Sequence, residues 1–209
     1  MADVTIHGPP QSSYVRTARM ACEEKGISHD LTPVEPGSDA HRQLHPFAKF
    51  PILEHGGVTV CETSAICRYI DDVFDGPALV PADAEARATM ETWISNVNCY
   101  FYPDMVRDYV LQYVFPRGAD GKPDRKVIDG ALPGIKRDLA VLDRALDGVD
   151  FVAGRLSLAD LFIAPVMAVL SMFPEGKQAI GDFPNIQRVG GPMMNRPSFQ
   201  RTQPPPPQS

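Results

Sequence analysis

The sequence has no surplus of basic residues and no long apolar run, and its first residues do not have the pattern of a secretory signal. Lys and Arg together number 20 against 26 Asp and Glu, which gives a formal net charge of −6 and no basic block that could follow a nucleic-acid backbone. No apolar stretch approaches the roughly 18 residues of a membrane span. The N-terminus carries an acidic residue where a secretory signal has positive charges. These absences predict a cytoplasmic protein with neither a nucleic-acid nor a membrane partner.

The chain has four cysteines, at Cys22, Cys61, Cys67 and Cys99. Their spacing is irregular and includes no C-x-x-C pair, so it matches neither a disulfide framework nor a dithiol redox centre. Because they lie within apolar segments, we expect reduced cysteines that serve packing. His41 and His45 are four residues apart, but without a third ligand we expect a solvated helix face and no metal site.

The beginning of the chain predicts a parallel βαβ unit. A β-branched run over 4–7 stops at Gly8, and two prolines follow it. A helix is expected next, with serines as candidate N-caps and Gly26 at its C-terminal end. A second strand near 29–34 then requires a crossover helix between two parallel strands.

The next segment predicts a hairpin and a helix. Two short strands flank the turn His55-Gly56-Gly57, and apolar residues at helical spacing follow them. The more polar residues 35–46 are expected to form a loop with a short helix. Residues 1–76 are therefore expected to form an α/β domain of order βαβ-α-ββα.

The remainder of the chain is expected to be helical. Prolines and a glycine predict a linker over residues 77–83, and residues 84–201 show helical periodicity without strand alternation. The expected helices run from about Ala84 to Tyr113, Lys126 to Leu146, Ser157 to Met172 and Asn185 to Met194. Residues 202–209 are rich in proline and are expected to form a mobile tail.

Ser12 and Ser13 stand at the junction between a loop and a helix. Free backbone N–H groups and the positive end of the helix dipole favour an anion at such a position. A serine hydroxyl that donates a hydrogen bond to a thiol's sulfur there stabilises the thiolate. Serine is also a common N-cap, so a purely structural role is the alternative interpretation.

Two later segments offer groups for a peptide-like ligand. Pro51 begins a short strand, and a cis Phe50–Pro51 bond would expose the N–H and C=O of Phe50 to an extended peptide. Glu62 and Thr63 lead a strand into a helix, where Thr63 can hold a carboxylate and Glu62 an ammonium group. Each segment taken alone also fits an ordinary strand entry or helix cap.

The order of the three segments resembles the N-terminal domain of the glutathione S-transferases, particularly the serine-type phi, theta, delta and zeta classes. The resemblance covers roughly the first 75 residues and rests on the runs G-P-P-Q-S-S-Y-V-R, P-F-A-K-F-P-I-L and V-C-E-T-S-A-I-C-R-Y-I. It implies a thioredoxin-like glutathione-binding domain followed by an all-helical bundle. It also implies a homodimeric detoxification enzyme that uses glutathione as co-substrate and needs no other cofactor.

The resemblance assigns Ser12 to the catalytic position that activates the glutathione thiol for attack on an apolar electrophile, with Ser13 as the alternative. A glutathione-dependent isomerase of the zeta type is a second possibility, although Tyr14 stands where the zeta-like cysteine belongs. A noncatalytic binding or regulatory member of the family is a third.

The glutathione contacts implied by the resemblance fall on His41, Lys49, Phe50, Pro51, Glu62 and Thr63. Phe50 and Pro51 take the cysteinyl position, and Glu62 with Thr63 the γ-glutamyl position. The family's basic pair for the glycyl carboxylate has no clear counterpart here. Lys49, His41 or Arg42 is the expected substitute.

The expected helical domain supplies two further motifs. Ser157 and Asp160 form an S-x-x-D capping arrangement like that of the family's core helix, with a role in folding, and Pro165 is expected to bend that helix. The family places its acceptor-substrate pocket, facing the first domain, on the helix that carries an aromatic and thioether stripe. That stripe consists of Tyr100, Phe101, Met105, Tyr109 and Tyr113, and ordinary core packing is the alternative interpretation.

Overall fold

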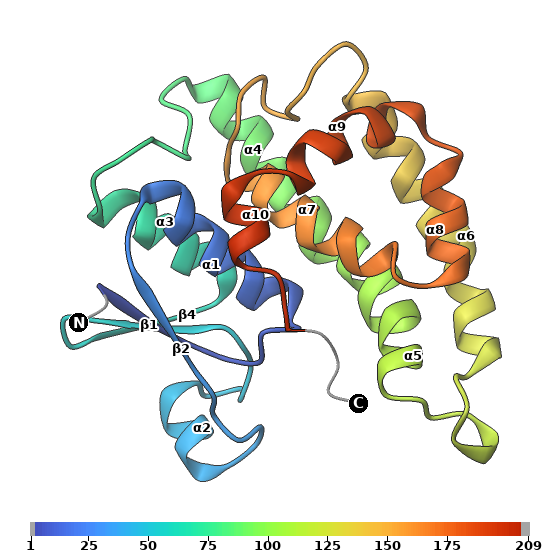
Figure 1. Ribbon diagram of the computed structural model, residues 1–209, viewed down its shortest axis with the longest axis horizontal. Coiled ribbons are helices and arrows are strands. Elements are labelled where there is room, and N and C mark those ends of the chain that lie inside the picture. Colours follow the sequence, from blue (N-terminus) through green and yellow to red (C-terminus); the bar gives the residue numbers. More distant parts are fainter. Residues whose placement is uncertain (1–2, 206–209) are drawn as a thin grey trace. The chain divides into compact units, whose positions relative to one another are not determined.

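The computed structural model describes residues 3–205, which divide into two compact units (Figure 1). Among these residues, unit 1 comprises 3–81 together with 195–205, and unit 2 comprises 82–194. The sequence pattern placed 195–201 with the helical domain and 202–209 in a mobile tail. The structure differs on both, since Thr202 is 0% exposed and belongs to unit 1, while residues 206–209 lie outside the described part of the chain. The difference arises because the last helix, α10 (Pro197–Arg201), packs on α1 (Ser13–Lys25) of unit 1.

Unit 1 is built on a four-stranded sheet of order β2-β1-β3-β4. Its strands are β1 (Val4–His7), β2 (His29–Thr32), β3 (Ile52–His55) and β4 (Val58–Cys61). β1 pairs in parallel with β2, whereas β3 runs antiparallel to both β1 and β4. The predicted βαβ unit and hairpin are both confirmed.

Helices α1 and α3 (Thr63–Val73) lie side by side on one face of this sheet (Figure 1). Their apolar faces bury Ala18 and Ile66 completely, together with Ile6 of β1. Period-2 alternation on the strand and period-3.6 spacing on the helices bring these side chains to one layer. The short helix expected in the 35–46 loop is α2 (Asp39–Leu44), which Ser38 caps.

Unit 2 contains only helices and connecting loops in the part of the chain that the structure describes. These elements are α4 (Ala84–Asn96), the π-helix η1 (Val97–Val110), α5 (Leu111–Val114), the 3-10 turn η2 (Ala119–Gly121), α6 (Arg125–Ala145), α7 (Leu158–Leu170), α8 (Pro174–Gly181) and α9 (Pro184–Met194). None of the described helices is long and apolar enough to cross a membrane.

The structure refines the predicted helices of unit 2. The single pattern from Ala84 to Tyr113 is continuous, but its middle has the wider π-helical pairing, and Pro103, which has no N–H to donate, lies in that part. Helix α7 begins with the predicted capping box, in which the Ser157 N–H donates to the Asp160 carboxylate at 2.9 Å, and it continues through Pro165. Helix α8 was missed, although a proline at its first position is a helix-start signal.

Candidate active site

Ser12 is the N-cap of α1 and is half-buried. Its Oγ accepts a hydrogen bond from the Val15 N–H at 3.4 Å, and within residues 3–205 its hydroxyl donates to no acceptor. Ser13 is only 5% exposed. The Ser12 hydroxyl therefore keeps its proton available for a ligand at the positive end of the helix.

Gly8 brings the loop before α1 against the loop before β3. Its φ is +142°, and a Cβ there would lie 2.6 Å from Val15 Cγ2 and 3.1 Å from Phe50 Cβ. A larger residue needs movement of α1 or of Phe50, so glycine is required for this close approach. The loop that leads into Ser12 and the Phe50–Pro51 segment thus meet at Gly8.

The Phe50–Pro51 peptide bond is cis, the conformation considered from the sequence. Phe50 is half-buried. Among the described residues, no hydrogen bond engages the main-chain N–H or C=O of Phe50. Both groups are available to pair with an extended peptide.

The buried side chain of His41 supports the Lys49–Phe50 segment. The side chain is 0% exposed, its Nδ1 accepts a hydrogen bond from the Gly37 N–H, and its Nε2 donates to the Lys49 carbonyl, each at 3.1 Å. The ring also stacks on Phe50 with centroids 4.1 Å apart. A ring with both nitrogens engaged has no donor left for a carboxylate, so these contacts favour a positioning role over the direct ligand contact expected from the sequence.

The other two basic candidates for a glycyl carboxylate differ in their surroundings. The Arg42 guanidinium donates to the Gly37 carbonyl and lies 3.8 Å from the Asp39 carboxylate. The Lys49 side chain is exposed and makes neither a hydrogen bond nor an ion pair with any described residue. Of Arg42 and Lys49, Lys49 is therefore the cation that can bind a ligand carboxylate without giving up an internal contact.

Glu62 and Thr63 form the start of α3, as expected. Glu62 occupies the N-cap position with a φ of +71°, an uncommon conformation for a residue other than glycine and one that recurs at ligand sites. The Thr63 N–H is among those that a helix leaves without an internal partner. Behind them, buried His45 accepts a hydrogen bond from the Phe47 N–H and directs its Nε2 toward Glu62 Oε1, 3.7 Å away.

The expected solvated face for His41 and His45 is wrong, since the two residues are 0% and 1% exposed. Each ring instead bonds the main chain of the loop between α2 and β3. No group of three or more potential metal ligands occurs among residues 3–205.

The cysteines do not contribute an activated thiol to this region. Cys22 and Cys67 are buried and free of disulfides, as expected, and burial raises the pKa of Cys22 to about 12. Burial also raises the pKa of Cys61, whose thiol donates to the Leu44 carbonyl. Cys99 is exposed, which differs from the expected packing role.

The sequence divides between two family models. Residues 6–78 match the N-terminal domain and residues 100–197 the C-terminal domain of glutathione S-transferase. The chain belongs to the glutathione S-transferase family. This confirms the predicted family, the two-part fold and the prediction of a glutathione transferase.

Individual relatives extend the match over the whole chain. Glutathione S-transferase 3 of Zea mays is 30% identical over 222 residues, which cover 100% of this chain and 99% of the relative. A structure of glutathione S-transferase III in the apo form has a TM-score of 0.87, with 30% identity and 100% coverage of both chains. Maize glutathione S-transferase I in complex with an atrazine glutathione conjugate has a TM-score of 0.86, with 25% identity and 97% coverage of both.

In this transferase the aromatic stripe of unit 2 is largely occupied by internal contacts. Met105 and Tyr109 are 0% exposed, and Tyr100 is 54% exposed. The Tyr109 hydroxyl donates to Glu175 Oε2 at 3.0 Å and accepts from the Gly176 N–H at 2.8 Å. The half-buried Tyr113 donates to the same carboxylate oxygen at 2.6 Å. Within unit 2 these phenols hold the first turn of α8.

Arg16 is the residue beside Ser12 that the sequence patterns did not single out. It is 6% exposed, and its partners, Phe199 and Thr202, lie more than 180 positions away in the chain. An arginine near the start of a helix gives no sign of such burial. The burial of Arg16 becomes apparent only in the folded structure, where the C-terminal segment packs on α1.

Proposed function

We propose that the chain conjugates glutathione to an apolar electrophile, with Ser12 as the residue that activates the thiol. The observation that carries this assignment is the Ser12 hydroxyl, which has a free proton at the N-terminus of α1. Donation of that hydrogen bond to the sulfur, together with the helix dipole, lowers the pKa of the bound thiol below its usual value of about 8.5. Ser13 is the alternative, and its burial makes it the weaker candidate.

The remaining groups hold the three residues of the tripeptide in place. The unpaired main chain of Phe50 pairs with the cysteinyl residue, as in strand addition. Glu62 accepts from the γ-glutamyl ammonium group, and Thr63 donates to the adjacent carboxylate. Exposed Lys49 reaches the glycyl carboxylate, while His41 keeps the Lys49–Phe50 segment in place.

In the reaction, the proton leaves the thiol, and the thiolate sulfur then forms a bond to the electrophilic carbon. The carbon either expels a leaving group with the bonding electron pair or passes the pair to a conjugated acceptor atom that is then protonated. The protein contributes thiol activation and positioning, which are the two effects that suit this chemistry.

The acceptor pocket is proposed on the helix that carries the stripe. Tyr100 and Tyr113, the two more exposed members, would contact the acceptor. Buried Met105 and Tyr109 would support them from behind. An apolar lining with a few polar groups suits a hydrophobic electrophile.

The test is to bind the protein to immobilised glutathione and titrate the bound thiol by ultraviolet absorbance in wild type, Ser12→Ala and Ser13→Ala. A lowered thiol pKa that rises in Ser12→Ala and stays low in Ser13→Ala is the expected result. A rise only in Ser13→Ala transfers the role to Ser13. Absence of binding, or an unchanged thiol pKa in both variants, contradicts the mechanism.

We also propose a cytoplasmic homodimer, in keeping with the family and with the frequency of symmetric pairs among soluble enzymes. Light scattering coupled to size-exclusion chromatography measures the mass directly. A mass near twice the 22.9 kDa of one chain is expected, and a single-chain mass contradicts the proposal.

A further inference from the structure

Arg16 is a buried cation in the first part of α1. Its Nη2 donates to the Phe199 carbonyl at 2.8 Å, and its Nε donates to Thr202 Oγ1 at 3.4 Å. The guanidinium carbon also lies 3.7 Å from the centre of the Phe199 ring. The C-terminal segment that includes α10 therefore holds this side chain in one place, by its main chain, a hydroxyl and an aromatic face.

No carboxylate pairs with Arg16 among residues 3–205. The charged group that acts electrostatically on it is Arg19, which has the same sign. Burial and Arg19 lower the pKa of Arg16 to about 10, so the group remains a cation at neutral pH. A buried charge of this kind is costly, and its electric field is screened less than that of a surface charge.

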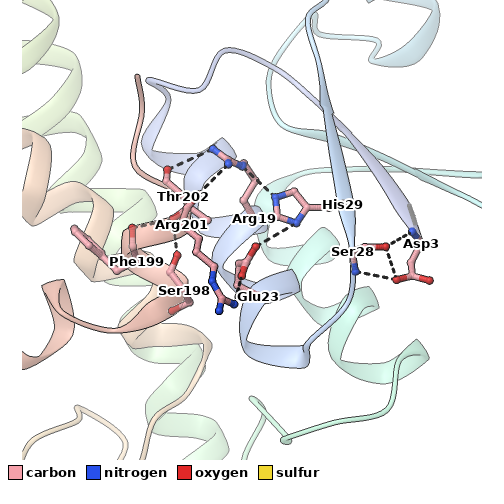
Figure 2. Close-up of polar contacts among 9 residues, drawn as sticks. All are labelled: Asp3, Arg19, Glu23, Ser28, His29, Ser198, Phe199, Arg201 and Thr202. Carbon is pink, nitrogen blue, oxygen red and sulfur yellow. Dashed lines mark hydrogen bonds and ion pairs between the residues drawn. The ribbon is translucent and has the colours of Figure 1, made fainter. Parts of the chain in front are cut away.

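Arg19, one turn further along, has different surroundings. Its guanidinium donates to His29 Nε2 at 3.2 Å and to the carbonyls of Arg201 and Thr202 (Figure 2). Glu23 stands on the far side of the same imidazole, 3.9 Å from His29 Nδ1, and also pairs with Arg201. Arg19 thus shares the C-terminal segment with Arg16, but it has a carboxylate in its neighbourhood.

Arg16 lies close to Ser12 along the helix. The Arg16 N–H donates to the Ser12 carbonyl at 3.0 Å, so the two residues are one helical turn apart. Side chains on a helix lean toward the N-terminal end and cover the turn before their own Cα. The cation therefore adds to the positive potential that the helix dipole already creates at Ser12.

We propose that Arg16 is a positioning residue that stabilises the glutathione thiolate at Ser12, and that residues 199–202 of the C-terminal segment hold its charge in place. The inference rests on the function proposed above. Arg16 does not touch the sulfur and acts through the potential at the start of α1. The last helix of the chain thereby becomes part of the thiol-activating apparatus.

The experiment titrates the thiol of bound glutathione in wild type, Arg16→Gln, Arg16→Lys and the matched control Arg19→Gln. Arg16→Gln is expected to raise the thiol pKa by about half a unit to one unit, the size of a single charge acting across a partly shielded interior. Arg16→Lys keeps the positive charge but loses part of the guanidinium's hydrogen bonding and its stacking on Phe199, so it is expected to raise the thiol pKa less than Arg16→Gln does. Arg19→Gln loosens the same C-terminal segment and is expected to leave the thiol pKa near that of wild type.

Three results overturn the inference. An unchanged thiol pKa in Arg16→Gln removes the role of the charge. An equal rise in Arg16→Gln, Arg16→Lys and Arg19→Gln assigns the effect to the geometry of the segment alone. A wild-type protein that does not lower the thiol pKa removes the proposed function itself, and Ser12→Ala measured alongside separates that failure from the first two.

If Arg16→Gln does not fold, the double variant Arg16→Met with Thr202→Val is measured in its place. Apolar groups then replace both members of the contact between the guanidinium and the Thr202 hydroxyl, so neither of these two groups is left without the other, and the remaining loss falls on the Phe199 carbonyl, which both of them contact. The double variant is expected to show the same rise in thiol pKa. A low thiol pKa in the folded double variant contradicts the inference.

Discussion

The polar groups at the start of α1 and those around α8 are used in opposite ways. In unit 1, among the described residues, the Ser12 hydroxyl has no acceptor for its proton, and the Phe50 main chain has no hydrogen-bond partner. In unit 2 the Tyr109 and Tyr113 hydroxyls both donate to Glu175. A polar side chain therefore offers a hydrogen bond to a ligand only where the fold leaves its donor or acceptor without an internal partner.

The pKa of Glu175 reflects the hydrogen bonds that the polar groups around α8 make with one another. Burial alone would raise its pKa, but hydrogen bonds from Tyr113, Arg125 and Tyr109 outweigh that effect and lower the pKa to about 2. Arg125 Nη1 donates to Glu175 Oε1 at 2.6 Å. The network fixes the first turn of α8 and keeps the carboxylate ionised across the neutral range.

The largest effect is expected for Gly8→Ala, which forces apart the two loops that meet at the proposed thiol site. The new Cβ would collide with Val15 and Phe50 in a left-handed backbone, and a cost of about 3 kcal/mol or more in the free energy of unfolding is expected. Glutathione binding should fall with it. Gly57→Ala is the control, because a Cβ at Gly57 meets no atom within 4 Å and only backbone strain of about 1 kcal/mol applies. Equal losses in the free energy of unfolding for Gly8→Ala and Gly57→Ala, measured by urea denaturation, would contradict the role assigned to Gly8.

Glu62→Ala is expected to weaken glutathione binding about tenfold to a hundredfold, the range for a hydrogen bond to a charged group. Isothermal titration with glutathione and with its analogue lacking the γ-glutamyl amino group makes the test specific. The analogue should lose little affinity in the variant. A parallel loss for both ligands would assign Glu62 a structural role instead.

Glu175→Gln is expected to change the response of stability to acid. The folded pKa of Glu175 lies below its ordinary value, so the stabilisation is present above pH about 4.5 and is lost as pH falls toward 2. The variant should be less stable at neutral pH and should lose less stability over that acid range. Urea denaturation at several pH values measures both, with exposed Glu85→Gln as the control. Parallel curves for wild type and Glu175→Gln would contradict the network.

The smallest effect is expected for Tyr113→Phe, which removes one hydrogen bond to Glu175 at a cost of about 1 kcal/mol in the free energy of unfolding. Tyr100→Phe is the matched change at an exposed position and should be nearly neutral. Neither should alter the thiol pKa of bound glutathione. A shifted thiol pKa in Tyr113→Phe would mean that unit 2 contributes to thiol activation.

Most of the fold could be predicted from the sequence because the patterns that indicate its helices, strands and turns are local. The alternation over Val4–His7, the turn at Gly56-Gly57 and the Ser157–Asp160 capping box each depend on residues a few positions apart. The burial of the cysteines and histidines was harder to predict, since burial depends on which distant segments pack over a residue. His41 and His45 have a polar sequence environment, yet both lie in the interior of unit 1.

The sequence by itself determined the order of the strands and helices over residues 4–73, the family and the segments that supply candidate glutathione contacts. The tertiary structure alone decided that Ser12 keeps a free proton, that His41 supports Phe50, and that Arg16 is buried beneath a segment more than 180 residues away. The physical reason is that periodicity and capping act within a few residues. Burial and the pairing of charges instead depend on contacts that form only when distant segments pack together.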